Sequence, residues 1–230
     1  MQTEKSGRPQ AMIAMSGGVD SSVAAYLMQQ AGYDCMGVTM KLYENEDAGV
    51  PRGHTCCTLD DVEDARRVAY ALGMPYYVFN YKDAFREQVM ARFAAAYQHG
   101  ATPNPCLDCN RYLKFGLLET RARALGCDVL ATGHYARVER DGQSGRWRLL
   151  RGRDRHKDQS YVLYQLTQHQ LAHLLLPVGE FDKPTIRGSA REAGLLNADK
   201  ADSQDICFVP DGDYVSFLRD YGHVELTPGD

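Results

Sequence analysis

The stretch that decides the fold is Ser16-Gly17-Gly18-Val19-Asp20-Ser21. A short apolar run over residues 11–15 precedes it and predicts a buried strand, and the run over residues 23–28 predicts a helix. A glycine turn between a strand and a helix lets backbone N–H groups approach an anion, and the helix N-terminus adds unpaired donors and a positive dipole. The stretch therefore predicts a phosphate-binding loop, with Asp20 suited to bind Mg²⁺ beside the phosphates.

This loop differs from the P-loop of kinases and GTPases, because no Gly-Lys-Ser/Thr follows it. It resembles the signature of the ATP pyrophosphatases, the PP-loop family, whose members bind the pyrophosphate of ATP here and transfer AMP to a carbonyl-type oxygen. A Gly-Gly turn that merely opens a helix is the alternative, and six matched positions between a strand and a helix disfavour it. The resemblance implies nucleotide contacts from Ala14, Met15, Ser16, Gly17, Gly18, Val19, Asp20 and Ser21.

Length and composition limit the class of protein. The chain has 230 residues, 44% of them hydrophobic, enough for one large domain with a sizeable core. Residues 1–10 are polar and lack the apolar segment of a secretory signal, and no run of 18 apolar residues predicts a membrane span. Seven cysteines in such a chain favour thiols, metal binding or catalysis over structural disulfides. We expect a cytoplasmic protein.

Charge is unevenly distributed along the chain. The formal net charge is −4, so bulk charge does not indicate a nucleic-acid binder. Residues 137–157 nevertheless carry eight basic residues against three acidic ones. This strip is typical either of a surface that binds the phosphates of a nucleic-acid backbone or of the solvated face of a hairpin. Charge alone does not distinguish these two interpretations.

Strand and helix patterns alternate along the chain. Further strands are expected over residues 35–40, 76–79 and 129–132, and helices over residues 58–73, 83–98 and 110–125, with a loop over residues 47–57 that includes Cys56 and Cys57. A hairpin is expected over residues 135–150, and helices over residues 168–175, 184–193 and 211–220. This alternation predicts an α/β fold with a doubly wound parallel sheet. Ligands bind beyond the carboxyl ends of such strands, which places the glycine loop, Met40 and Gly133-His134 around one crevice.

Cys106-Leu107-Asp108-Cys109 forms a C-x-x-C at the junction of a loop and a helix. A helix N-terminus there is expected to lower the thiol pKa. The spacing suits half a zinc site, a redox pair or iron–sulfur ligands, and no second C-x-x-C follows. Cys207 stands alone in an apolar run, which by itself favours a place in the core.

The whole chain resembles the bacterial tRNA-specific 2-thiouridylases within the PP-loop family. Besides the glycine loop, the matching motifs are Thr102-Pro-Asn-Pro105 with Cys109-Asn110, Ala131-Thr-Gly-His-Tyr135, Lys157-Asp-Gln-Ser-Tyr161 and Ser203-Gln-Asp-Ile-Cys-Phe208. The fold that the resemblance implies is the adenine-nucleotide alpha-hydrolase-like PP-loop fold.

The resemblance implies a reaction and a set of site residues. ATP would adenylate the C2 oxygen of the wobble uridine in tRNA, and sulfur would then displace AMP to give 2-thiouridine. Cys109 falls on the position of the nucleophile, and Cys207 on that of the second cysteine, which carries a persulfide. Met40 and Gly133 fall on nucleotide contacts. The remaining positions contact the target base (Asn104, Pro105 and Cys106) or the tRNA (His134, Lys157, Asp158 and Gln159).

One departure from the family concerns Cys106. Many members have an aspartate there, proposed as an acid/base group, and cysteine resembles a branch that holds a [4Fe–4S] cluster through three cysteines. Cys106, Cys109 and Cys207 would then be ligands, and the open iron would bind the sulfide to be delivered. In the alternative, Cys109 and Cys207 act as a persulfide pair, with a disulfide bond expected among the cysteines. The sulfur donor would be a persulfide carrier protein or sulfide.

A second departure concerns length. Family members continue into a central domain and a C-terminal β-barrel, so we expect residues 1–209 to form the catalytic domain and residues 210–230 the start of a truncated central domain. tRNA binding is then expected to be weak and strongly dependent on salt. Two alternatives remain: a PP-loop enzyme that makes 2-thiocytidine in tRNA, and a non-catalytic ATP- or metal-binding module.

Overall fold

A computed structural model describes residues 7–43, 59–202, 206–209 and 212–221. At its centre lies a parallel sheet that has five strands among these residues, in the order β3-β2-β1-β4-β7. The strands are β1 (Gln10–Ala14), β2 (Asp34–Lys41), β3 (Tyr76–Asn80), β4 (Val129–Thr132) and β7 (Leu174–Leu175). The α/β fold with a parallel sheet that the sequence predicts is confirmed.

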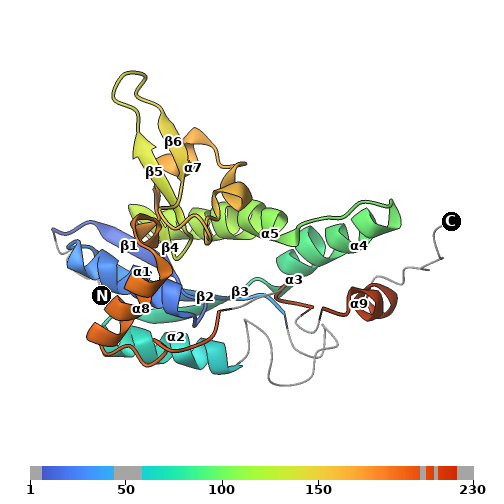
Figure 1. The fold of residues 1–230 in the computed structure, drawn as a ribbon, viewed down its shortest axis with the longest axis horizontal. Helices are drawn as coiled ribbons and strands as arrows, with labels where there is room; N and C mark the ends of the chain where they lie inside the picture. Colours follow the sequence, from blue (N-terminus) through green and yellow to red (C-terminus); the bar gives the residue numbers. More distant parts are fainter. Residues whose placement is uncertain (1–6, 44–58, 203–205, 210–211, 222–230) are drawn as a thin grey trace.

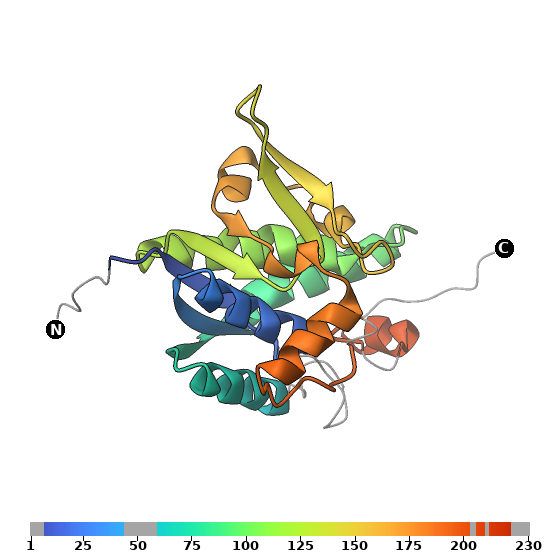
Figure 2. The same ribbon diagram turned by 60° about the vertical axis from the view of Figure 1, so that its left-hand side comes forward.

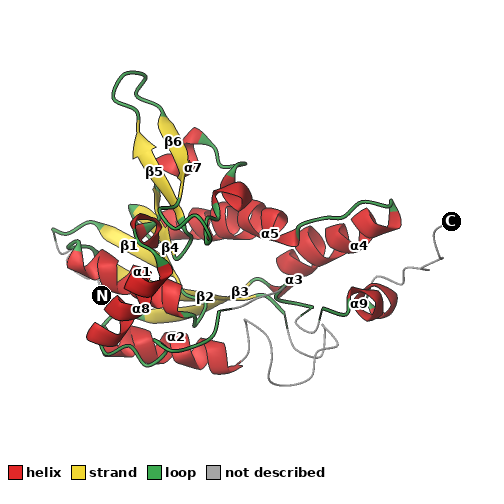
Figure 3. Ribbon diagram, viewed as in Figure 1, coloured by secondary structure: helices red, strands yellow, loops and turns green. Residues whose placement is uncertain are grey.

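Helices cover both faces of the sheet (Figure 3). One face carries α1 (Val19–Gln30), α2 (Leu59–Ala71) and α8 (Lys183–Glu192). The other carries two long helical stretches with π-helical segments: α3 (Lys82–Phe85), η1 (Arg86–Met90) and α4 (Ala91–Gln98), and then α5 (Pro105–Asp108), η2 (Cys109–Leu118) and α6 (Glu119–Ala124). Successive side chains of a strand point to opposite faces of the sheet. Along β1, Met12 therefore belongs to the apolar cluster on one face and Ile13 to the apolar cluster on the other.

The chain between β4 and α8 extends away from the sheet. An antiparallel hairpin, β5 (Ala136–Arg140) and β6 (Trp147–Arg151), projects at the top of Figure 1. Short elements follow: η3 (Ser160–Leu163), α7 (Gln168–Ala172) and η4 (Pro177–Glu180), with α9 (Tyr214–Asp220) near the C-terminal end. The hairpin is confirmed as predicted. The expected loop over residues 47–57, with Cys56 and Cys57, lies outside the described residues.

Two predicted helices differ from the structure. The helix expected from residue 110 begins at Pro105, because Asn104 caps it by accepting a hydrogen bond from the Cys106 N–H (3.0 Å) and proline suits the first helical position. The helix expected over residues 168–175 ends at Ala172, and Leu174–Leu175 joins the sheet beside β4 instead. A short apolar run fits either structure, and tertiary pairing decides.

The strand order fixes the place of the ligand crevice. From β1 the chain builds outward to β2 and β3, and then returns to the other side of β1 as β4. The loops that follow β1 and β4 therefore start at the carboxyl ends of two neighbouring strands and run in opposite directions. Open α/β sheets bind ligands at such a point. Among the described helices, none combines the length and apolarity needed to cross a membrane.

Candidate functional site

The glycine loop lies directly at this crevice. Gly17 has a φ of +78°, and Gly18 caps α1 in an extended conformation with a φ of −84°. A Cβ on Gly17 would lie 2.3 Å from the backbone oxygen of Asp61, so only glycine fits between β1 and α2. The Ser21 and Ser22 hydroxyls donate to the Gly18 carbonyl, each at 3.0 Å, and so stiffen the turn.

A side chain from the far end of the sequence also stabilises this turn. The Asn197 amide donates to the Gly17 carbonyl (2.9 Å) and to the Ser22 hydroxyl (2.8 Å), and its side chain is buried. No short sequence spacing links Asn197 to the glycine loop, so sequence reasoning missed it. The turn is therefore fixed before any ligand arrives.

Gly133 confirms that the loop after β4 meets the glycine loop. A Cβ on Gly133 would lie 2.7 Å from the backbone nitrogen of Ser21 and 2.8 Å from the carbonyl carbon of Asp20. Met40, at the end of β2, is buried two residues beyond Val38, the partner of Ala14. The structure thus brings Gly133 against the glycine loop and places Met40 beside the same sheet edge.

Asp20 lies at the centre of a charged cluster that the sequence did not reveal. Its Oδ1 accepts hydrogen bonds from the Tyr135 hydroxyl (2.7 Å) and the Lys183 ammonium (2.9 Å), and its Oδ2 accepts from Lys183 at 2.8 Å. Burial, and then the hydrogen bond to Asp20, raise the pKa of Tyr135, so its hydroxyl keeps its proton and donates it.

Asp202 extends this cluster. Its carboxylate pairs with Lys183 (2.7 Å), Lys157 (2.9 Å) and Arg187 (3.0 Å). Burial would raise the pKa of Asp202, but the hydrogen bonds from Lys183 and Lys157 outweigh burial and lower it to about 2. Three cations thus share two carboxylates beside the N-terminus of α1. Figure 2 shows α8, which carries Lys183 and Arg187, lying beside α1.

Two further sequence-predicted tRNA contacts have internal partners. The Asp158 carboxylate accepts from the Gly152 N–H (2.9 Å) and the Ser160 hydroxyl (2.9 Å), and the Gln159 amide oxygen accepts from the Tyr135 N–H (3.0 Å). The Gln159 bond orients the residue that in turn holds Asp20. A role for these residues in binding tRNA stays a prediction.

His134 is buried, and its Nδ1 lies 2.7 Å from the Thr132 hydroxyl. Burial first, and then the charge of Lys114, lower the pKa of His134 well below its usual value. The ring is therefore neutral at physiological pH. If it contacts RNA as the resemblance implies, it does so through its ring or a hydrogen bond and not through charge.

The C-x-x-C cysteines lie at the start of the long helix, with unequal exposure. Cys106 is exposed and Cys109 is buried. Burial raises the pKa of the Cys109 thiol, and Lys114 opposes this only in part. The expectation of a lowered thiol pKa is therefore wrong for Cys109, because desolvation outweighs its position near a helix start.

Cys207 packs against the apolar cluster that contains Cys109, so the two predicted catalytic cysteines belong to one region of the molecule. The Tyr43 hydroxyl donates to its backbone carbonyl. No disulfide bond joins cysteines within the part of the chain that the structure describes. The disulfide expected from the resemblance is therefore not formed here.

Asn110, directly after Cys109, presents an unusual polar group. Its side chain is 2% exposed, and neither its amide nitrogen nor its amide oxygen has a hydrogen-bond partner among the residues that the structure describes. A buried amide without partners costs about 1–3 kcal/mol. Asn110 is therefore a buried polar side chain that nothing in the described part of the chain stabilises by hydrogen bonding.

Metal binding divides into two cases. Mg²⁺ usually keeps several waters and takes one or two carboxylates with substrate phosphates, so Asp20 beside the glycine loop fits that role. The [4Fe–4S] cluster has less support: among residues 7–43, 59–202, 206–209 and 212–221, no three cysteine, histidine or acidic side chains gather as a metal site. Cys106, Cys109 and Cys207 are thus not gathered as a ligand set in this structure, and the cluster stays a prediction.

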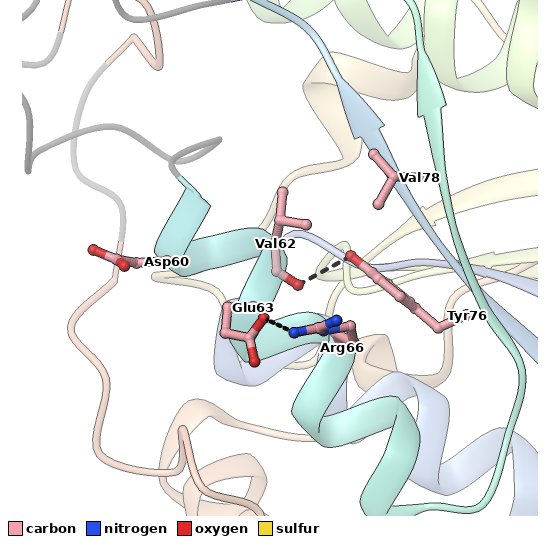
Figure 4. A pocket seen from close by; sticks show the side chains of 6 residues that line it. All are labelled: Asp60, Val62, Glu63, Arg66, Tyr76 and Val78. Carbon is pink, nitrogen blue, oxygen red and sulfur yellow. Dashed lines mark hydrogen bonds and ion pairs between the residues drawn. The ribbon is translucent and has the colours of Figure 1, made fainter.

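A separate cavity of about 570 Å³ lies between α2 and the edge strand β3, and none of the predicted site residues lines it (Figure 4). Its lining is Asp60, Val62, Glu63, Arg66, Tyr76 and Val78. Arg66 pairs with Glu63, and the Tyr76 hydroxyl donates to the Val62 carbonyl at 3.2 Å. The internal pairing leaves no convergent reactive group in it.

Comparison with known proteins gives concordant matches. Residues 9–211 match the family described as "tRNA methyl transferase HUP domain". The chain is 53% identical over 219 residues to a "tRNA-specific 2-thiouridylase MnmA" from Moorella thermoacetica, covering 95% of this chain and 61% of the relative. It is 49% identical to the protein of the same name from Clostridioides difficile, covering 95% of this chain and 60% of that relative. The chain thus spans about three fifths of the length of these curated relatives.

One solved structure supports the fold. A "4-thiouridine synthetase - RNA complex with bound ATP" superposes with a TM-score of 0.54 at 18% identity, covering 94% of this chain and 50% of that chain. At this identity the likeness shows a shared fold of the PP-loop type.

Proposed function

The chain belongs to the family described as the tRNA methyl transferase HUP domain, and from that premise we propose that it performs ATP-dependent 2-thiolation of a wobble uridine in tRNA. The observation that carries the proposal is its sequence identity, at about half of all positions, to relatives named as 2-thiouridylases. The site supports it chemically, because an anion-binding loop and two cysteines serve nucleotide activation and sulfur transfer.

The first step joins the base to AMP. The uridine C2 oxygen attacks the α-phosphorus of ATP, the bond to the bridging oxygen breaks, and pyrophosphate leaves with the electron pair. The N-terminus of α1 at Val19, with its backbone N–H groups, would bind the phosphates. Mg²⁺, bound through Asp20, would neutralise phosphate charge. The adenylate then offers AMP as a leaving group far better than oxide.

The second step replaces oxygen with sulfur. Cys207 carries a persulfide loaded by a carrier protein; its outer sulfur attacks C2, and AMP leaves with the electrons of the C2–O bond. Cys109 then gives up its proton and attacks the inner sulfur. The S–S bond breaks, and its electron pair goes to the sulfur on C2. The products are 2-thiouridine and a Cys109–Cys207 disulfide, which a thiol reductant reopens. The common apolar cluster of both cysteines supports this pairing.

The partner is tRNA, and the hairpin supplies cationic surface for it. Several arginines there have internal partners: Arg148 pairs with Glu139 (2.6 Å), and Arg153 with Glu180 (3.0 Å). Arg146 and Arg155 take part in no ion pair in the described part of the chain, and both side chains are exposed. We propose that they contact phosphates, which makes tRNA binding strongly dependent on salt.

A thiolation assay tests this function. Purified chain, unmodified tRNA, Mg–ATP and a persulfide donor are combined, and the tRNA nucleosides and released AMP are quantified by mass spectrometry. We expect 2-thiouridine and stoichiometric AMP. Formation of 2-thiocytidine would favour the other PP-loop thiolase, and ATP binding without AMP release would favour a binding module.

A matched pair of variants tests the sulfur step. Cys109→Ala is expected to abolish 2-thiouridine formation but leave ATP binding unchanged. Cys127→Ala is the control, because Cys127 is also a buried thiol whose pKa burial raises, and it has no place in the mechanism. Equal activity of the two variants would contradict the role of Cys109.

The [4Fe–4S] cluster stays a prediction with its own measurement. Protein purified without oxygen is examined by visible absorption, where thiolate-ligated clusters absorb broadly near about 400 nm. A band lost in Cys106→Ala would support the cluster and replace the persulfide step. A colourless protein that thiolates tRNA would support the persulfide route, which is in line with the exposed Cys106 and the buried Cys109.

A further inference from the structure

The disulfide that ends the proposed sulfur step forms in a place with little access from solvent. Cys109 is 9% exposed, Cys207 is half-buried, and both pack in one apolar cluster. Thiol–disulfide exchange requires an attacking thiolate in contact with one of the two sulfurs. A protein reductant has poor access to such a disulfide, so a second turnover needs a route that carries the disulfide to the surface.

Two neighbouring residues of α4 link the segments that carry these two cysteines. Arg92 pairs with Asp108 at 3.1 Å, and the ring of Phe93 meets that of Phe208 edge-on, with ring centroids 5.4 Å apart. Each of these two partners is a direct chain neighbour of one of the cysteines. The C-x-x-C turn and the segment at residues 206–209 therefore pack on the same part of one helix.

Cys106 offers the missing route, because it is exposed and lies on the same helical turn as Cys109. The Cys109 N–H donates to the carbonyls of both Pro105 and Cys106. The second of these bonds joins residues three positions apart, whose side chains lie close together on one helix face. Burial mainly raises the pKa of the Cys109 thiol, and the charge of Cys106 adds to it, so the two sulfurs lie within electrostatic range.

The other cysteines that the structure describes do not provide this route. Cys35 and Cys127 are both buried, and burial raises the pKa of each thiol to about 11. Cys35 also belongs to the apolar cluster on the opposite face of the sheet. Within the described part of the chain, Cys106 alone combines exposure with a position beside the nucleophile.

We propose that Cys106 is the resolving thiol of the sulfur step, which moves the disulfide from the buried pair to the surface; this inference rests on the proposed function. The Cys106 thiol gives its proton to water, and its thiolate attacks the Cys109 sulfur. The bond between Cys109 and Cys207 breaks, and its electron pair leaves on Cys207, which takes up a proton. Cys207 is then a thiol again and accepts the next persulfide.

The new disulfide joins Cys106 to Cys109 and has one exposed sulfur. A dithiol reductant attacks the Cys106 sulfur, and the electron pair of the broken bond goes to Cys109, which is protonated. The second thiol of the reductant then displaces Cys106. The protein disulfide is reduced by two electrons, and the dithiol is oxidised to its own disulfide.

The location of the disulfide after one turnover tests the proposal. Wild type, Cys106→Ser and Cys35→Ala are loaded with persulfide, freed of donor and mixed with Mg–ATP and unmodified tRNA without reductant. After an acid quench and alkylation, peptide mass spectrometry identifies the disulfide. The oxidised proteins are then treated with reduced thioredoxin or with dithiothreitol, and the return of free thiols is followed over time. Cys35→Ala is the control for the loss of one cysteine elsewhere.

We expect a Cys106–Cys109 disulfide in wild type and in Cys35→Ala, and a Cys109–Cys207 disulfide in Cys106→Ser. Thioredoxin should reduce wild type at least tenfold faster than Cys106→Ser, whereas the small dithiothreitol should show a much smaller difference.

Equal rates with thioredoxin, or a wild-type disulfide that stays between Cys109 and Cys207, would overturn the proposal. So would a Cys106→Ser variant without product in the first turnover, because Cys106 would then act in thiolation itself. A wild type that makes no 2-thiouridine would refute the proposed function alone, since disulfide exchange can still be followed after oxidation with diamide.

Discussion

The two glycines of the loop should respond in opposite ways to the same substitution. Gly17 has a φ of +78°, and an added Cβ would lie 2.3 Å from the Asp61 carbonyl oxygen. Gly18 has a φ of −84°, and its added Cβ would meet nothing closer than the Ser16 hydroxyl, at 3.5 Å. Gly17 is therefore required by the fold. The fold does not require a glycine at position 18. We infer that Gly18 has no side chain so that a phosphate can approach the backbone there.

The structure gives the size of each effect. Gly17→Ala adds left-handed strain of about 1–2 kcal/mol and an overlap with backbone of about 1–3 kcal/mol, so we expect a loss of about 2–5 kcal/mol. Gly18→Ala gains about 0.4–1 kcal/mol from a less flexible unfolded chain and loses a similar amount at the helix cap, so stability changes by less than about 1 kcal/mol. Gly73→Ala isolates the strain, because its φ is +65° and nothing lies within 4 Å of the added Cβ.

Urea unfolding and ATP titration of the three variants provide the test. We expect Gly17→Ala to be clearly less stable than Gly73→Ala, and Gly18→Ala to keep its stability while losing ATP affinity. If Gly17→Ala unfolded at the same urea concentration as Gly73→Ala, the close approach to Asp61 would be refuted. Wild-type ATP affinity in Gly18→Ala would refute a phosphate at that position.

Three further predictions concern titration and burial. Asn110→Leu should raise the free energy of unfolding by about 1 kcal/mol, since it removes an unpaired buried amide, and should abolish thiolation; a less stable, active variant would contradict this. Because the folded pKa of Asp202 is depressed to about 2, its stabilisation of about 2 kcal/mol is present above about pH 4 and lost as pH falls towards 2, so Asp202→Asn should flatten that part of an acid denaturation curve. Iodoacetamide at pH 7 should alkylate exposed Cys106 well before Cys109, whose pKa is raised by burial; equal rates by peptide mass spectrometry would contradict the buried state.

Local sequence patterns predicted the fold well because they coincide with local structure. The strand, glycine turn and helix around Gly17 depend on neighbours in sequence. The helix expected from residue 110 was placed too late, because the cap at Asn104 starts it at Pro105. The pattern failed at Leu174–Leu175, where pairing with Leu130 and Ala131 of β4 decides the conformation. A strand of two residues is too short to show the alternation of apolar and polar residues from which strands are predicted.

The candidate site was only half predictable, for a physical reason. The glycine loop, Gly133 and the cysteines stand in recognisable motifs. Lys183 and Asn197 reach the loop from more than 160 positions away, and only the folded chain brings them there. The thiol of Cys109 shows the opposite error: its position at a helix start suggested a lowered pKa, and burial, which sequence spacing does not report, raises it.

These distant contacts define what the smallest ATP-binding unit must contain. The turn is held by Asn197 at Gly17, Asp20 is held by Tyr135 and Lys183, and Lys183 is in turn held by Asp202. A fragment that ended after β4 would keep every residue of the glycine motif and would lose all four of these partners. Asp20 would then carry an uncompensated charge beside the phosphates, which repels the anion that the loop attracts. The motif alone is therefore an incomplete anion site, and the segment from Tyr135 to Asp202 completes it.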